Sequence, residues 1–332
     1  MWFQKLTGFK EVSPEQVRAN IEIKDDKLIS KLNGAGYAYG KLEVPTLEEL
    51  RDQYKLTEEP ISKIQVSEVV GNVQTLHKDE ANKGALFQVA SQFNLLEMIS
   101  PNRTPESGVG IYEYDGTQGP ACAVACGAGT IYRNYFAPTN GHIGQTSTNQ
   151  IDCLKEIGIA LGNDRFNLWE MKNGYALLTR DGLKNISNQI KSKTEKEYEV
   201  LKGILKIGVQ WDSEVTISEN GHQVSQAYCS ALPVAYSRIE TELWEDFARI
   251  ILEATYEATF YAALKNYKRN ANNKVFLTLV GGGAFGNETN WIFDAIKHSI
   301  NKFSNIPLDV KIVSYGSSKP GVRQLIDSIE LW

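Results

Sequence analysis

Four glycines within six residues give the clearest chemical signal in this sequence. The run LTLVGGGAFGN (277–287) lies between an apolar segment typical of a buried strand and a segment typical of a helix. A tight turn that needs positive φ explains one or two glycines. Four glycines indicate a segment whose backbone amides must stay accessible, without side chains to cover them. Bare amides at the start of a helix, where partial positive charge gathers, form a good binding site for a diphosphate.

Acidic residues form a second group, in a loop that follows another apolar run. ALFQVASQFN (85–94) is typical of a central strand, and Glu97, Glu106, Glu113 and Asp115 follow among glycines and polar residues. Ligand clefts of open α/β sheets form at the carboxyl ends of strands. Carboxylates beside a sugar can accept hydrogen bonds from its hydroxyls, stabilise an oxocarbenium-like centre or activate water.

The glycine run also fits G-x-G-x-x-G, which leaves a nicotinamide-cofactor oxidoreductase as a minor alternative. A dinucleotide fold needs an acid at the end of the next strand, whereas DVKIVSYG carries Asp309 at its start. A P-loop is excluded because no Gly-Lys-Ser or Gly-Lys-Thr follows. We therefore expect the diphosphate site without either of these folds.

Composition and charge restrict the partners. The formal net charge is −5, which argues against broad affinity for nucleic acid or an anionic membrane. The four cysteines and four histidines show no zinc-ligand spacing, so no metal and no cofactor is expected. The first 30 residues lack an apolar signal region, which predicts a cytoplasmic protein, or a secreted effector exported without a cleaved signal.

The order of patterns predicts the architecture. Residues 1–70 read as a helical N-terminal extension, with Ser13 and Thr46 as helix caps. From 71 to 332, strand patterns alternate with helix patterns, and an insertion at about 155–220 holds a hairpin at the KNG turn and a lysine-rich helix pair. We expect an α/β domain with three α/β/α layers and a mixed central sheet.

These segments resemble the macrodomain superfamily, and especially its poly(ADP-ribose) glycohydrolase-like branch. The resemblance covers roughly 85–136 and 222–325 and rests on FQVASQFN with its acidic loop and on the late strand that runs into GGGAFGN. YDGTQGPACAVACGAGTIYRNYF (114–136) resembles a divergent subgroup that includes bacterial effectors which remove ADP-ribose from arginine. The resemblance implies a macrodomain-like fold, ADP-ribose as ligand and product, and an ADP-ribosylated protein as substrate.

The resemblance also implies roles for individual residues. Glu106 and Asp115 would be the acids nearest the scissile N-glycosidic bond, with Glu97 as a third candidate; the sequence leaves open which of them is the base. Asn94 would contact the distal ribose, Phe285 would cover it, and Tyr315 would flank adenine. The ligand-binding set is completed by Gln118 and by the loop residues Gly282, Gly283, Ala284, Gly286 and Asn287.

Departures from the family pattern shape the expected substrate. The acidic loop lacks the unbroken Gly-Gly-Gly and the adjacent Glu-Glu of the polymer-cleaving enzymes. We therefore expect hydrolysis of a mono-ADP-ribosyl bond, and carboxylates suit the cationic leaving group of arginine. The alternative from another class is a module that binds ADP-ribose without chemistry.

Overall fold

A seven-stranded mixed sheet forms the centre of the molecule. The computed structural model describes residues 1–56 and 63–329. The strand order is β4-β11-β12-β6-β13-β14-β5; β12 to β5 are mutually parallel, and β11 runs antiparallel to both β12 and β4. The bounds are β4 Lys41–Glu43, β5 Gln65–Val70, β6 Leu86–Ala90, β11 Gly208–Glu214, β12 Gln223–Cys229, β13 Lys274–Leu277 and β14 Asp309–Ser314. Central β6 is almost wholly buried because helices cover both of its faces.

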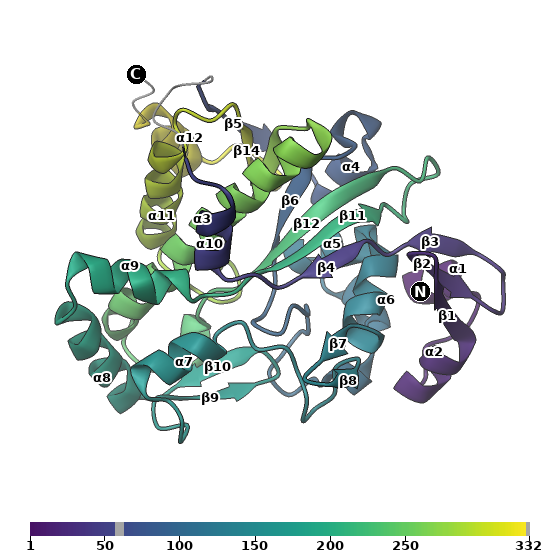
Figure 1. Cartoon of the computed structure of the whole chain (residues 1–332), viewed down its shortest axis with the longest axis horizontal. Helices are drawn as coiled ribbons and strands as arrows, with labels where there is room; N and C mark the ends of the chain where they lie inside the picture. The colour runs from purple at the N-terminus through teal and green to yellow at the C-terminus, as the bar shows by residue number, and fades with distance from the viewer. Residues whose placement is uncertain (57–62, 330–332) are drawn as a thin grey trace.

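Helices cover the two faces of this sheet, as Figure 1 shows. On one face, α10 (Glu245–Asn270) lies against β6, β12 and β13, and α11 (Thr289–Lys302) and α3 (Leu47–Gln53) pack on α10. On the other face lie α4 (Val73–Lys78), α5 (Gln118–Ala125) and α6 (Gly127–Tyr135). α12 (Pro320–Asp327) packs beside edge strand β5. The predicted three-layer α/β/α architecture with a mixed sheet is confirmed.

The N-terminal 70 residues contribute more than the predicted helices. α1 (Trp2–Thr7) and α2 (Pro14–Asn20) are followed by the small antiparallel sheet β1 (Ile21–Lys24), β2 (Lys27–Ser30) and β3 (Gly36–Ala38). Both edge strands of the central sheet, β4 and β5, also come from this region. The prediction of a helical extension was incomplete because strands of three to six residues give little alternation to recognise.

The predicted insertion is also partly sheet. It holds α7 (Lys155–Leu161), the hairpin β9 (Trp169–Lys172) and β10 (Tyr175–Leu178), and the helix pair α8 (Arg180–Lys191) and α9 (Glu195–Gly203). The hairpin and the helix pair follow the prediction. Residues 208–220 do not follow the prediction. Strand β11 begins at Gly208 and belongs to the central sheet, so the insertion ends before residue 208.

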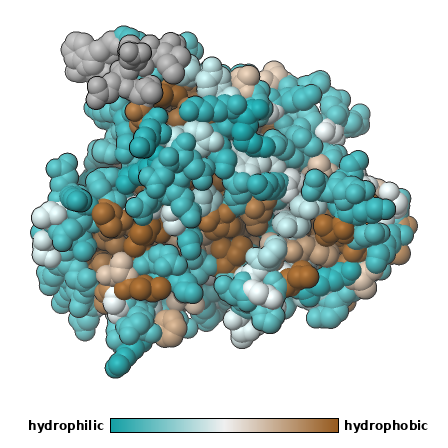
Figure 2. All heavy atoms as spheres, in the orientation of Figure 1, coloured by the Kyte–Doolittle hydropathy of each residue, from teal (hydrophilic) through white to brown (hydrophobic). Residues whose placement is uncertain are grey.

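The surface in Figure 2 is mainly hydrophilic, with hydrophobic residues gathered in a few patches across its middle. All four cysteines are buried and free, as expected for small core residues. Among the residues that the structure describes, no helix has the length and apolar character needed to cross a membrane.

Candidate active site

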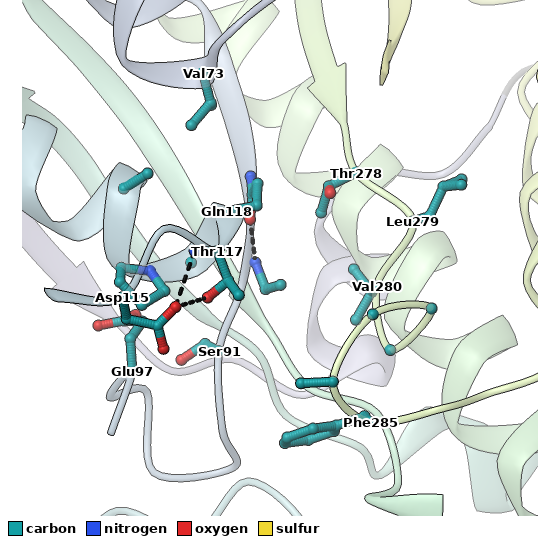
Figure 3. Close-up of a pocket in the computed structure, with 18 of the residues that line it drawn as sticks. Val73, Ser91, Glu97, Asp115, Thr117, Gln118, Thr278, Leu279, Val280 and Phe285 are labelled. Atoms are coloured by element: carbon teal, nitrogen blue, oxygen red, sulfur yellow. Dashed lines mark hydrogen bonds between the residues drawn. The ribbon is translucent and has the colours of Figure 1, made fainter. Parts of the chain in front are cut away.

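The two predicted segments line one cleft of about 440 Å³. One wall consists of residues 90–92, 97–99 and 115–121, and the other consists of residues 278–285. Figure 3 shows Ser91, Glu97 and Asp115 on the first side, facing Phe285 and the glycine loop across the cavity. Residues 71–73, 313, 315 and 319 also line it, together with Tyr175 of strand β10, Ala231 and Tyr236. Segments almost two hundred residues apart thus meet at the carboxyl ends of β6 and β13.

The glycine loop has a conformation that larger residues would not adopt. Gly281 and Gly286 have φ of +80° and +69°, where a side chain is strained. A Cβ on Gly281 would lie 2.5 Å from the Cβ of Ala231, and one on Gly286 would lie 2.8 Å from the Cβ of Ala235. The amide of Asn287 donates to the carbonyl of Gly281 at 2.9 Å and closes the turn.

Several amides of this loop are free to bind an anion. In the described part of the chain, the amides of Gly281, Gly283, Ala284 and Phe285 donate no hydrogen bond. All four residues, and Gly282, line the cleft. Backbone N–H groups clustered in a concave turn form an anion-binding site, so this wall can hold a phosphate or diphosphate.

The end of the loop braces the turn, and its predicted ligand contacts stay predictions. Gly286 and Asn287 do not line the cleft. The buried side-chain amide of Asn287 donates to the carbonyls of Leu232 at 2.8 Å and of Gly281 at 3.3 Å, so it braces the turn. Helix α11 begins only at Thr289, and the loop amides rather than the helix start face the cavity.

Three aromatic rings border the cleft at Phe285. The ring centres of Tyr175 and Tyr236 lie 5.3 and 5.6 Å from that of Phe285, and 5.2 Å from each other. The hydroxyl of Tyr175 donates to the carbonyl of Met98 at 2.7 Å, which ties the β9–β10 hairpin to the acidic wall. Tyr315, at the end of β14, lies at the rim and is 73% exposed.

Glu97 is a buried acid at the cleft. Its side chain has no exposed surface, and Oε2 lies 3.4 Å from Nη2 of Arg133. Burial raises the pKa of Glu97 to about 7, against the lowering effect of Arg133. Oε1 has no hydrogen-bond partner among the described residues. A carboxyl group that titrates near neutral pH beside a cavity is suited to general acid or base catalysis.

Asp115 stands at the entry to α5. Its Oδ1 accepts from the amide of Thr117 at 2.9 Å and from the hydroxyl of Thr117 at 2.6 Å, drawn as dashed lines in Figure 3. The next turn of chain approaches β6 very closely, since a Cβ on Gly119 would lie 1.9 Å from the carbonyl oxygen of Ala90. The glycine at position 119 therefore allows α5 to begin directly beside the strand end.

Gln118 lines the cleft, but its side chain is committed to the strand. Oε1 accepts from the amide of Ala90 at 2.9 Å, and Nε2 donates to the carbonyl of Gln88 at 2.9 Å. The pairing of β13 with β6 covers Leu86 and Phe87 only, and the side chain of Gln118 pairs with backbone groups of β6 beyond it. Gln118 thus positions the acidic wall, and its predicted ligand contact stays a prediction.

Two more predicted site residues, besides Gly286 and Asn287, are not brought to the cleft. Asn94 is fully buried; its Nδ2 donates to Gln150 at 2.8 Å, and its Oδ1 accepts from the amide of Leu96 at 3.1 Å. Glu106 accepts from the amide of Ser147 at 2.8 Å in a different loop. The lining includes neither residue. Local hydrogen bonds hold both side chains elsewhere, and the ribose contact of Asn94 and the catalytic role of Glu106 stay predictions.

Other lining residues were not predicted from the sequence. They are Ser91, Gln92, Thr117, Tyr175, Tyr236 and Lys319. Thr117 could have been found, since it stands just before a small-residue helix in a position typical of an N-cap. The two tyrosines could not, because the tertiary docking of the hairpin and of residues 234–236 brings them to the cleft. Within the residues described, no group of three or more His, Cys, Asp or Glu side chains could hold a metal ion.

Comparisons with known proteins gave solved structures only. No protein-family model matches the sequence, and no curated protein sequence matches it. Poly(ADP-ribose) glycohydrolase from Thermomonospora curvata is similar with a TM-score of 0.46 and 10% identity, over 94% of this chain and 96% of that one. The Deinococcus radiodurans enzyme, solved in complex with ADP-ribose, is similar with a TM-score of 0.43 and 10% identity, over 87% and 94%.

Proposed function

We propose that this protein is a hydrolase that removes mono-ADP-ribose from modified protein side chains, arginine foremost. The observation that carries the proposal is the pairing of walls in one cleft. A loop with free amides faces a wall with two carboxylates, one of them buried and titrating near neutral pH. A diphosphate attached to a sugar matches both walls at once.

The cleft orders the parts of such a ligand. The diphosphate would accept from the amides of 281 and 283–285, and the adenosine end would extend toward Tyr315 and Lys319 on the β14 side. The distal ribose would lie at Phe285, within the aromatic group that also contacts the acidic wall through Tyr175. This placement directs C1″ toward Glu97 and Asp115, and positioning of this kind supplies several kcal/mol by removing the entropic cost of encounter.

The reaction needs one base and no acid at the leaving group. When the bond between C1″ and the arginine nitrogen breaks, both electrons go to nitrogen, so a guanidinium departs as a neutral guanidine. A water adds to the oxocarbenium-like C1″ and gives its proton to the carboxylate of Glu97, and that proton then passes to the released guanidine. Asp115 would hold the ribose hydroxyls or the water, since one of its oxygens is fixed by Thr117.

Arginine is the favoured acceptor for electrostatic reasons. A guanidinium at the acidic wall gains charge-assisted hydrogen bonds with carboxylates, whereas a modified carboxyl side chain would meet like charge. The absence of adjacent glutamates in the acidic loop separates this wall from that of polymer-cleaving enzymes in the resembling family. A mono-ADP-ribosyl bond is therefore the proposed substrate.

The test combines binding with turnover. ADP-ribose should raise the melting temperature more than AMP or NADH does, because ligand that binds the folded state stabilises it. The parent should release ADP-ribose from an ADP-ribosyl-arginine peptide, and Glu97→Gln should lose this activity by roughly two orders of magnitude or more while it keeps ADP-ribose affinity.

Glu106→Gln is the matched control, since it removes the same charge from the neighbouring loop but outside the cleft; its activity should stay at the parent level. A parent that binds ADP-ribose but releases none from any modified peptide would establish the non-catalytic binding module instead. Preference for NADH over ADP-ribose would favour the oxidoreductase alternative.

A further inference from the structure

The two oxygens of the Glu97 carboxyl group have different surroundings. Oε2 is directed to the core, 3.4 Å from Nη2 of Arg133, whereas Oε1 has no partner among the described residues and belongs to a side chain that lines the cleft. Buried polar atoms are nearly always paired, so an unpaired carboxylate oxygen at a cavity indicates an atom kept free for a ligand or a proton. We propose that Arg133 of α6 is the positioning residue that fixes Glu97 in this orientation.

Arg133 holds the backbone of the same segment as well as its carboxylate. Its Nε donates to the carbonyl of Leu95 at 3.0 Å. Leu95 has φ of +63°, a left-handed conformation that costs a leucine about 1–2 kcal/mol. Such conformations persist only where the surroundings over-determine them, and they cluster at functional sites. The guanidinium thus sets both the path of the chain at 95–97 and the rotamer of the acid.

Arg133 is itself held by a buried chain of polar groups. Nη1 donates to the hydroxyl of Tyr228 at 2.5 Å, and that hydroxyl donates to Oε1 of Gln226. Nε2 of Gln226 donates to Nε2 of His77 at 3.1 Å, which makes that nitrogen an acceptor and leaves Nδ1–H of His77 to donate to the carbonyl of Val73 at 2.7 Å. Val73 also lines the cleft.

This chain orients groups and does not conduct protons. A guanidinium stays protonated at all pH values that proteins tolerate, so no proton can pass through Arg133. Beyond Arg133, the hydroxyl of Tyr228 and Nε2 of Gln226 donate away from Glu97 and toward His77, and these side chains are buried. Buried networks in which each member is satisfied rigidify the groups that they hold. The network therefore fixes the direction of Arg133.

The electrostatic consequence concerns the pH at which Glu97 can act as a base. The titratable neighbours are Arg133 of α6, Tyr112 of η3 (Gly110–Tyr114), Cys122 of α5 and Tyr228 of β12. Burial raises the pKa of both tyrosines and of the cysteine, so all three stay neutral; the charged side chains near Glu97 are Arg133 and Asp115 of the same wall, and Arg133 is the positive one. Loss of that positive charge disfavours the carboxylate and raises its pKa.

The test measures the protonation of Glu97 directly. The carboxyl C=O stretch is followed by infrared spectroscopy against pH in the parent, Arg133→Met and Arg133→Lys, and it is assigned by its loss in Glu97→Gln. Arg133→Met should move the titration upward by roughly 1–3 pH units, and Arg133→Lys should move it less because the charge remains. Arg18→Met is the control, since Arg18 binds the carbonyl of Tyr135 away from the cleft and should move nothing.

The activity measurement depends on the proposed function, and the spectroscopic one does not. With ADP-ribosyl-arginine peptide, the acid limb of the rate profile should move by the same number of pH units as the infrared titration, and ADP-ribose affinity should stay constant. An unchanged titration in Arg133→Met overturns the proposal; if that variant does not fold, Arg133→Gln also removes the charge, and an unchanged titration in it does so. If the parent protein releases no ADP-ribose, the proposed function is refuted, and the infrared titration alone decides the role of Arg133.

Discussion

Glu97→Gln should make the folded protein more stable at neutral and alkaline pH. Burial raises the pKa of Glu97 from 4.5 to about 7. Between these pH values the carboxyl group is ionised in the unfolded chain but mostly protonated in the folded state. The raised pKa does not lower the stability of the fold at a pH below the unfolded pKa of 4.5. The loss of stability grows as the pH rises from 4.5 to about 7 and is constant at higher pH. At 1.36 kcal/mol per pH unit, the full cost is on the order of 3 kcal/mol.

The glutamine variant avoids this cost without a change of shape. Protonated glutamic acid and glutamine both leave Arg133 without a charged partner, so the variant should match the parent near the lower end of the titration. Urea unfolding at about pH 5 and about pH 8 should show the stability advantage of the variant growing by roughly 2 to 3 kcal/mol. An advantage that stays constant across this range would refute the assignment of Glu97 as a buried acid.

Glu106→Gln provides a control of opposite sign. The amide of Ser147 lowers the pKa of Glu106, so its carboxylate contributes stability above the unfolded pKa and loses it as the pH falls. This variant should therefore be less stable than the parent at about pH 8 and should approach it in acid. Each variant removes one negative charge, so the comparison between them is independent of net charge.

Four further substitutions test the walls of the cleft. Gly119→Ala should lower the free energy of unfolding by about 1–3 kcal/mol or more in urea, because its Cβ would lie 1.9 Å from the carbonyl oxygen of Ala90. Gly281→Ala should also destabilise, since its φ is +80°, whereas Gly283→Ala, with no atom within 4 Å of the added Cβ, should keep its stability and bind ADP-ribose more weakly by calorimetry. Gln118→Ala should cost about 1–3 kcal/mol, because the amide of Ala90 loses its acceptor.

The sheet and the glycine loop could be predicted because their signals are local. Runs such as ALFQVASQFN and NKVFLTLV are apolar on both faces, as parallel strands covered by helices must be, and β6 and β13 formed there. The edge strands were missed since β4 has three residues and pairs only with β11, more than 160 residues later in the chain. Pairing over such a distance leaves no trace in a local pattern.

The site was predicted in outline but not in its residues. The order of motifs in the sequence placed acids and glycines at the correct strand ends. It could not show which acid lies buried at the cleft, because burial depends on the tertiary structure. Glu97 lies two residues after a leucine in left-handed conformation, and this turn directs it into the core. Glu106 lies in a 3-10 turn (Pro105–Ser107) whose hydrogen bonds direct it outward. Tertiary structure alone separates these two outcomes.

The stability cost of Glu97 bears on the choice between hydrolase and binding module. A module that only binds ADP-ribose needs the free amides and the aromatic group, and a glutamine at position 97 would fill the same space at lower cost. An acid whose ionisation opposes folding gives no advantage to binding of a ligand that is itself anionic, because a carboxylate at the cleft repels phosphate. Proton transfer does require it, since a base works best when its pKa lies near the operating pH. Under the proposed function, the energetic penalty at Glu97 is the cost of a base whose pKa lies near neutral pH.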